Sequence, residues 1–201
     1  MAYASWVEPN KTSGNGNDTV SWSATEHTGR LQRTTTATFS ASGVEDKTLT
    51  IVQYGKTEFV DLDDTAAVSK TGGTVTISGT SNSTKLTFSL TGTNGIGLTL
   101  PATYTAAGAS TNNGAAVTGD PGANQAFSFS VTFTGIDANA TISTKTSQLT
   151  VTDNAGNTDT CTITQAAGDA YLTISPTTIT IPAAGTAQSV SVSSNTNWSI
   201  S

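Results

Sequence analysis

Few side chains in this sequence could do chemistry. Its 201 residues contain one histidine, His27, and one cysteine, Cys161. Nucleophilic catalysis needs a base beside the nucleophile, and nothing near His27 in TEHTGR marks a partner for it. Cys161 lies in the alternating run TDTCTITQ, which is typical of a small buried hydrophobic residue. We therefore expect neither residue to be catalytic.

The carboxylates fall in turns, as in DLDD at 61–64 and DNAGNTD at 153–159. A glycosidase needs an opposed acidic pair in a cleft, and a calcium loop needs a full alternation of oxygen ligands with glycine. Neither segment has these features, and no glycine-rich segment follows a strand and opens a helix. We expect turn-forming residues, with no catalytic group, no metal site and no cofactor, and hence no enzyme.

Charge excludes one class of partner. The net charge is -6 at pH 7, with no basic stripe interleaved with aromatic residues. Binding to a nucleic acid backbone would require such a stripe, so we reject nucleic acid as a partner. No apolar stretch approaches the length of a membrane span, and we expect no membrane insertion.

The periodicity predicts strands. Thr, Val, Ile and Phe recur in short runs that Gly, Asn, Asp and Ser separate, and no window shows helical spacing of apolar residues. The length suits two sandwich-sized units. The chain is therefore predicted to be all-β. We divide it into 1–56, 57–168 with a long loop at 91–124, and 169–201.

An internal repeat marks the module ends. The segments TLTIVQYG at 48–55 and TCTITQAAG at 160–168 share the frame T-x-T-I-x-Q followed by glycine, so each is expected to close a module. The core and structural residues predicted within this frame are Ile51, Gln53, Cys161, Ile163 and Gln165.

Three tryptophans are expected in module cores. ASWVEP near the start and TNWSIS at the end place Trp6 and Trp198 at what looks like the same position of a module. A two-sheet sandwich of about 100 residues buries an aromatic residue at such a position. Trp22 shares a strand face with Val20 in TVSWSA and is also assigned to the core.

The outer segments are too short to close a sandwich alone. Residues 1–56 and 169–201 together approach one domain of about 100 residues. One hypothesis is that 169–201 completes 1–56, in the same chain or in another copy. The shared position of Trp6 and Trp198 argues against it, and the rival explanation is that 169–201 opens a further module. Both remain open from the sequence.

Three residues are candidates for partner contacts. Tyr104 is a large side chain in the sparse stretch 91–124, and long loops are often functional. Arg30 and Arg33 flank a strand and could bind an acidic partner, while the alternative is a charged edge strand protected from unwanted pairing.

These motifs resemble the BACON family of immunoglobulin-like domains. The C-terminal piece carries the family's opening, L-x-I-S-P-x-x-I-x-I-x-A-x-G followed by VSVSSNTNW. The N-terminal piece carries its second half, with Trp6, GNGNDTV, the two arginines and TLTIVQYG. The middle segment shares only the closing strand. The resemblance implies tandem immunoglobulin-like β-sandwiches and a module rather than a chemistry.

BACON-like domains occur in virion proteins of crAss-like phages and in secreted glycoside hydrolases of Bacteroidetes. The start MAYASWVEPNKTSG has no apolar secretory core and no early lipid-accepting cysteine, which favours the phage setting. We expect an auxiliary or decoration capsid protein, or a head-fibre component, on the capsid surface after assembly in the host cytoplasm. Its expected partners are the major capsid protein, other virion proteins and itself. The alternative is a glycan-binding or spacer module at a bacterial cell surface.

Overall fold

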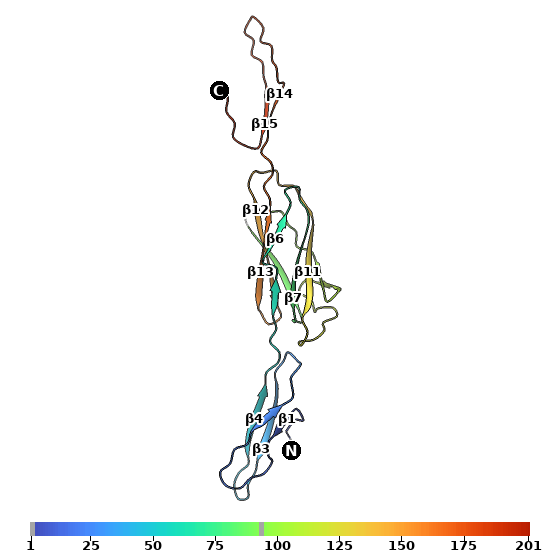
Figure 1. Ribbon diagram of the computed structural model, residues 1–201, viewed down its shortest axis with the longest axis vertical. Coiled ribbons are helices and arrows are strands. Elements are labelled where there is room, and N and C mark those ends of the chain that lie inside the picture. The colour runs from blue at the N-terminus through green and yellow to red at the C-terminus, as the bar shows by residue number, and fades with distance from the viewer. Residues whose placement is uncertain (1–2, 93–94) are drawn as a thin grey trace.

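Every regular element in the described part of the chain is a β-strand. The computed structural model describes residues 3–92 and 95–201, and its strands are β1 to β15. The all-β prediction is confirmed. Parts of two predicted segments, residues 1–2 of 1–56 and residues 93–94 of 91–124, lie outside the described residues. Figure 1 shows β1 to β4 at one end, a sandwich in the middle, and β14 and β15 at the other end.

Two sheets form the middle sandwich. The first has the order β10 (Ala109–Asn112), β9 (Thr103–Ala106), β11 (Phe127–Ile136), β7 (Gly73–Ser81) and β5 (Val60–Leu62). The second has the order β6 (Thr65–Val68), β13 (Thr158–Gln165), β12 (Lys145–Asp153) and β8 (Leu86–Thr91).

This strand order is that of an immunoglobulin-like sandwich. In that fold, strands A, B, E and D form one sheet and strands C, F and G form the other. Here β5, β7, β11 and β9 correspond to the first set, and β8, β12 and β13 to the second. The strand β6 runs parallel to β13 at the edge of the second sheet and is called A′ below. The predicted fold class is confirmed.

Alternation along the strands builds the core. In β11 the pattern FSFSVTFTGI buries every second side chain from Phe127 to Phe133, as expected for a strand with one face inward. Cys161, Ile163 and Gln165 on β13 have no exposed surface, so their assignment to the core is confirmed.

The stretch 91–124 is not one long loop. It contains β9 and β10, which extend the first sheet as a hairpin beside β11. Its strands are short, and the small and polar residues around them hide their alternation. The prediction of one long loop over 91–124 is therefore wrong.

The N-terminal segment forms two ribbons and no closed core. They are β1 (Val7–Pro9) with β2 (Trp22–Ala24), and β3 (Arg33–Phe39) with β4 (Lys47–Gln53). Within 3–56, the fully buried hydrophobic residues are Val7 and Ala37. Trp6, Trp22, Ile51 and Gln53, which we assigned to a core, are half-buried.

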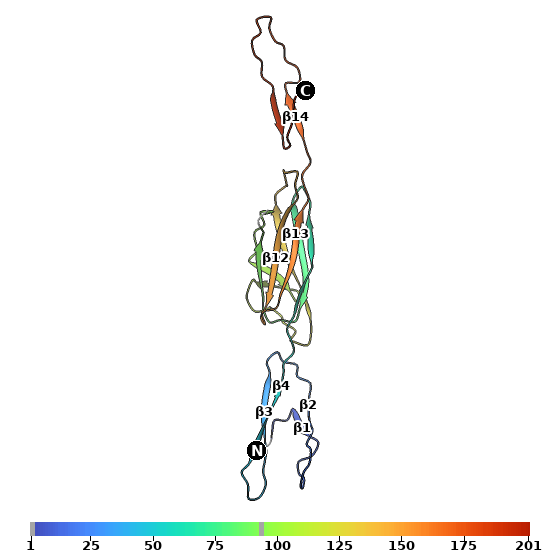
Figure 2. The same ribbon diagram turned by 90° about the vertical axis from the view of Figure 1, so that its left-hand side faces the viewer.

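The C-terminal segment is a hairpin of β14 (Leu172–Ser175) and β15 (Ser191–Ser194). It lies at the end of the molecule opposite to β1–β4, with the sandwich between them (Figures 1 and 2). The hypothesis that 169–201 completes 1–56 within the same chain is therefore wrong. Trp198, predicted to be a core residue, is 50% exposed because no other strand covers it. No helix in the described part of the chain is long and apolar enough to cross a membrane.

Candidate functional site

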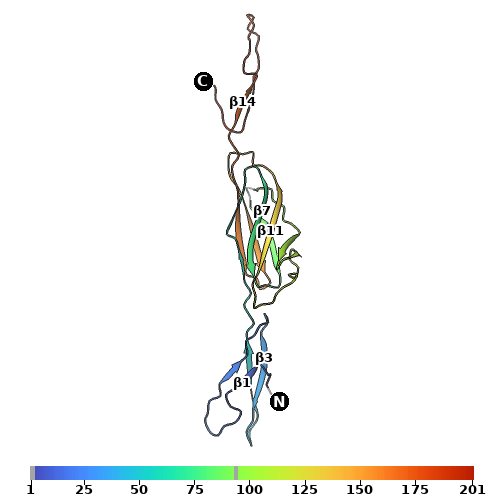
Figure 3. The same cartoon turned by 45° about the vertical axis from the view of Figure 1, so that its right-hand side comes forward.

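The open end of the N-terminal segment contains a hollow. It has a volume of about 560 Å³ and lies between the two ribbons, which Figure 3 shows splayed at the end away from the sandwich. Its walls include apolar groups from the two ribbons, from the loops at their tips and from the chain before β1: Tyr3, Val20, Trp22, Ala37, Phe39 and Val44. Tyr3 and Trp22 meet edge to face, with ring centres 5.1 Å apart. Two sheets that would normally pack together thus leave space between them.

A cation–π contact orders the other end of this segment. The guanidinium carbon of Arg33 lies 4.4 Å from the centre of the Trp6 ring. Arg33 Nε donates to Gln53 Oε1 at 2.9 Å, and Gln53 Nε2 donates to the carbonyl of Thr25 at 2.9 Å. These contacts link β3 and β4 to the chain that follows β2, so Arg33 has its partners within the chain.

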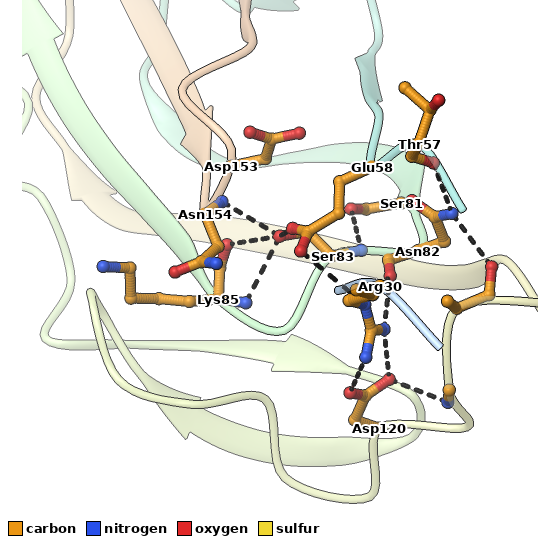
Figure 4. A network of polar contacts seen from close by, with 12 residues as sticks. Arg30, Thr57, Glu58, Ser81, Asn82, Ser83, Lys85, Asp120, Asp153 and Asn154 are labelled. Atoms are coloured by element: carbon orange, nitrogen blue, oxygen red, sulfur yellow. Dashed lines mark hydrogen bonds and ion pairs between the residues drawn. The ribbon is translucent and has the colours of Figure 1, made fainter. Parts of the chain in front are cut away.

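Arg30 fixes the N-terminal segment to the sandwich (Figure 4). Its guanidinium donates to both carboxylate oxygens of Asp120, at 2.9 Å each. Arg30 Nε donates to the carbonyl of Asn82 at 3.0 Å, and Glu58 Oε1 lies 3.8 Å away. The Arg30 side chain is only 15% exposed. A two-pronged contact between planar groups fixes orientation as well as distance, so this joint is stiff.

The backbone also closes tightly at this joint. The amide of Lys56 donates to the carbonyl of Gly29 at 2.9 Å. A Cβ on Gly55 would lie 2.1 Å from the carbonyl oxygen of Arg30. Only glycine fits there, which gives a physical reason for the glycine that ends the first copy of the repeat.

Behind Arg30, Asn82 ties three backbone segments together. Its amide nitrogen donates to the carbonyls of Thr57 and Ala123 at 3.0 Å each, and its Oδ1 accepts from the amide of Phe59 at 2.9 Å. The side chain is buried and all these groups are satisfied. The surface that receives Arg30 is therefore preformed by the sandwich.

The buried Glu58 has a separate partner. The hydroxyl of Ser83 donates to Glu58 Oε2, and Ser83 Oγ accepts from the amide of Asn154 at 2.9 Å. Figure 4 shows Glu58 between this serine and Arg30. A buried carboxylate with a hydroxyl donor and a nearby guanidinium serves the joint as a structural group.

The charge of Arg30 controls the ionisation of Asp120. Partial burial by itself would raise the pKa of Asp120, but the hydrogen bonds from Arg30 and from the amide of Gly122, with the Arg30 charge, lower it below its usual value. Asp120 therefore stays charged under ordinary conditions. The joint is an ion pair throughout the physiological pH range.

A second joint connects the sandwich to the C-terminal hairpin. The amide nitrogen of Asn195 donates to the carbonyls of Asp169, at 2.8 Å, and Ala140, at 3.2 Å. Lys70 Nζ lies 2.7 Å from both carboxylate oxygens of Asp169. This ion pair is exposed and thus adds little to stability.

The groups that could do chemistry hold the backbone instead. His27 Nε2 lies 2.6 Å from the carbonyl of Leu31. Asp63 accepts from the amide of Ser78, and Asp159 accepts from the amide of Leu62. Within 3–92 and 95–201, no three His, Cys, Asp or Glu side chains gather as metal ligands.

The three predicted contact residues are engaged inside the chain. Tyr104 is 4% exposed on β9, and its ring packs against Phe88 with centres 4.9 Å apart. Its interpretation as an exposed contact is wrong because its segment forms a strand whose inner face it occupies. The interpretation of Arg30 and Arg33 as partner contacts is also corrected, since Arg30 binds Asp120 and Arg33 lies on Trp6.

Cys161 is chemically protected. Burial raises the pKa of its thiol to about 11, and the nearby carboxylates of Asp63, Asp159 and Asp64 add to the increase. A thiol that stays protonated is a poor nucleophile. The residue acts as part of the core.

Sequence reasoning missed the acceptors of the joint. Asp120 lies in the turn-like sequence TGDPGANQ, and Glu58 and Asn82 lie in equally ordinary surroundings. The only available signal was one of two arginines in a charge-poor chain, because an arginine that is shielded from water needs a carboxylate. Nothing in the sequence indicates which carboxylate that is.

Two comparisons bear on this arrangement. Residues 1–54 match the BACON family, which is described as "Putative binding domain, N-terminal". No curated protein matches the chain. The segment with the hollow and the Arg30 joint is thus the one with a family resemblance, and that resemblance indicates a binding module.

Proposed function

From the BACON match of the N-terminal segment, we propose that this chain is a non-enzymatic structural protein of a bacteriophage particle. It serves as an auxiliary or decoration capsid protein or as a head-fibre component. Its immunoglobulin-like modules bind the major capsid protein or another virion protein. It is assembled in the host bacterial cytoplasm and resides on the capsid surface.

The joint at Arg30 is the observation that carries the proposal. A shielded, two-pronged ion pair to Asp120 holds the BACON segment in one orientation on the sandwich. A fixed orientation lowers the entropic cost of docking on a regular lattice. Copies that are linked to one another, each with a modest contact area, then gain avidity across the capsid.

The polar groups support a non-catalytic role. The single histidine and the carboxylates at the strand ends satisfy backbone groups of the fold. A catalytic acid or base would have to give up such contacts to reach a substrate.

The hollow favours the second candidate, a glycan-binding or spacer module of a Bacteroidetes cell-surface protein. Its aromatic pair, Tyr3 and Trp22, could contact a sugar. The two rings are inclined at 89°, however, and a stacking platform for a pyranose ring needs coplanar rings. We therefore rank this function second.

Purified phage particles provide the test. Peptides of this chain in the particle, and saturable binding of the pure chain to particles that lack it, are the expected results. Arg30→Ala should weaken that binding, while Lys56→Ala, which removes an exposed ion pair to Glu26, should leave it unchanged. Absence from particles together with retention on a polysaccharide column, lost in Trp22→Ala, would replace the virion role with the glycan role.

A further inference from the structure

The strand pairing and hydrogen bonds of the N-terminal segment match those of the second half of the sandwich. We call residues 3–56 the closing half. Gln53 and Gln165 differ by 112 in residue number, and each ends the last strand of its segment. Gln53 is paired with Arg33 in β3–β4, and Gln165 is paired with Lys145 in β12–β13. These two partners also differ by 112, so β3 and β4 correspond to strands F and G.

Side-chain contacts follow the same offset. The amide nitrogen of Gln53 donates to the carbonyl of Thr25, and that of Gln165 donates to the carbonyl of Asp137, again 112 residues later. The buried Ala37 likewise corresponds to the buried Leu149. The ribbon β1–β2, which precedes these strands, supplies the equivalents of D and E.

The hydrogen bonds of the C-terminal segment match those of the first half of the sandwich. We call residues 169–201 the opening half. Ser194 Oγ donates to the carbonyl of Tyr171 at 2.9 Å, as Ser81 Oγ donates to the carbonyl of Phe59 at 2.7 Å. Asn195 Oδ1 accepts from the amide of Tyr171 at 3.0 Å, as its counterpart in the sandwich does from Phe59. The β14–β15 pair therefore corresponds to strands A and B.

The rest of the opening half contains the equivalents of the remaining strands in the first half of the sandwich. Ile179 and Ile181 lie between β14 and β15, where A′ lies in the sandwich. Trp198 and Ile200 lie three and five residues after Asn195, and they match Leu86 and Phe88 of strand C, which lie four and six residues after Asn82, so the connection before C is one residue shorter. The opening half thus offers A, A′, B and the start of C, and the closing half offers D, E, F and G.

Both halves leave apolar surface uncovered. Ile174 is 50% exposed, whereas Leu62, its counterpart in the sandwich, is 3% exposed. Large exposed apolar side chains of the opening half lie on β14, between β14 and β15, and after β15: Leu172, Ile174, Ile179, Ile181, Trp198 and Ile200. The closing half has its hollow between its two ribbons, where the inner faces of the two sheets meet in a complete sandwich. Each half lacks what the other carries.

The sequence suggested that Trp6 and Trp198 share one position, which argued against one module built from both segments. Trp198 stands at the start of C, whereas Trp6 precedes β1 and contacts Arg33 on F. The two residues take different positions in a module, so one module can contain both. The sequence-based view that they share a position is wrong.

We propose that the opening half of one copy docks on the closing half of a second copy and forms a complete immunoglobulin-like module between them. The two halves of one chain lie at opposite ends of the molecule and cannot meet (Figures 1 and 2). Repeated contact therefore gives a head-to-tail filament in which complete and composite modules alternate. Following the pairs A′–G and C–F of the sandwich, residues 177–182 lie beside β4 and residues 198–201 beside β3.

Charge variants of the opening half test the contact. Ile174→Asp should abolish concentration-dependent oligomers in native mass spectrometry and light scattering. Thr173→Asp is the matched control because its counterpart in the sandwich, Asp61, is already an exposed aspartate. Since Ile174 is exposed in the single chain, the thermal transition of the middle sandwich should stay unchanged. Oligomers that persist in Ile174→Asp, or a wild-type chain that is monomeric at every concentration, would overturn the proposal.

Cysteine pairing tests the register. Thr150 pairs with Ser89 in the sandwich, and with Trp198 aligned to Leu86 the equivalent residues are Thr38 and Ser201. Chains carrying both Thr38→Cys and Ser201→Cys should form a ladder of disulfide-linked species under mild oxidation. A mixture of the two single variants should stop at linked dimers of one chain of each kind. No linkage beyond that of the single variants alone would contradict this register and the composite module.

The inference concerns contact between copies and stands apart from the proposed function. A filament that never binds phage particles would contradict the virion role and leave the composite module intact. A chain found in particles but monomeric in solution would support the virion role and contradict the composite module.

Discussion

The Arg30 guanidinium and the Asp120 carboxylate form two parallel hydrogen bonds although 90 positions separate the residues in the sequence. Asp120 lies in the loop between β10 and β11, an addition to the first sheet. Arg30 lies in the connection between β2 and β3 of the N-terminal segment. The β9–β10 hairpin of the sandwich thus supports the loop that positions the N-terminal segment.

Arg30→Ala should loosen this joint. The change leaves Asp120 and the buried Glu58 without their guanidinium, and an unsatisfied shielded partner costs roughly 1–3 kcal/mol. We expect faster proteolysis around residues 55–57 and a broader distance distribution in small-angle X-ray scattering. Arg30→Lys should restore only part of the stiffness, because lysine keeps the positive charge but cannot make the two parallel hydrogen bonds of the guanidinium. An unchanged scattering profile in Arg30→Ala would contradict a stiffening role.

Acid should open the same joint. Because the pKa of Asp120 is lowered in the folded protein, its stabilising effect is fully present above the ordinary value of 3.8 and is lost as pH falls through the lowered value. Loosening of the N-terminal segment should therefore begin only below about pH 4. Scattering or hydrogen exchange at stepwise lower pH measures it. Asp120→Asn should be loose already at neutral pH and should respond less to acid.

Tyr104 should matter for stability rather than for binding. Tyr104→Ala removes a ring packed against Phe88 and should lower the free energy of unfolding by about 3–5 kcal/mol. Its buried hydroxyl faces the backbone of Leu86 without the geometry of a full hydrogen bond, so Tyr104→Phe should change stability by less than about 1 kcal/mol. Urea unfolding of both variants distinguishes packing from a polar role. A large loss in Tyr104→Phe would show that the hydroxyl has a partner.

Cys161 should resist thiol reagents until the sandwich unfolds. Its pKa of about 11 in the folded protein lies above the ordinary value of 9.0. The raised pKa adds stability that is fully present below pH 9 and is lost as pH rises towards about 11. Ellman's reagent, added with and without denaturant, measures the protection. Cys161→Ala should make unfolding less sensitive to alkaline pH between these values, and rapid labelling of the native protein would contradict burial.

Strand content and module ends could be predicted because they depend on local pattern. Alternation in runs such as FSFSVTF indicates one buried face, and the frame ending in Gln53 and Gln165 recurs at corresponding strand ends. The short strands β9 and β10 escaped prediction because four residues of small or polar type carry little alternation. Tyr104 was misassigned for the same reason.

The sequence by itself determined that the chain is all-β, that its modules close with the T-x-T-I-x-Q frame, and that Cys161 belongs to a core, since all three follow from alternation of side chains along a strand. Only the tertiary structure decided that Arg30 meets Asp120, that Trp6 contacts Arg33 while Trp198 is half exposed, and that the two half-modules lie apart. These relationships depend on which strands pair across long stretches of sequence, and a local pattern contains no information on such pairing.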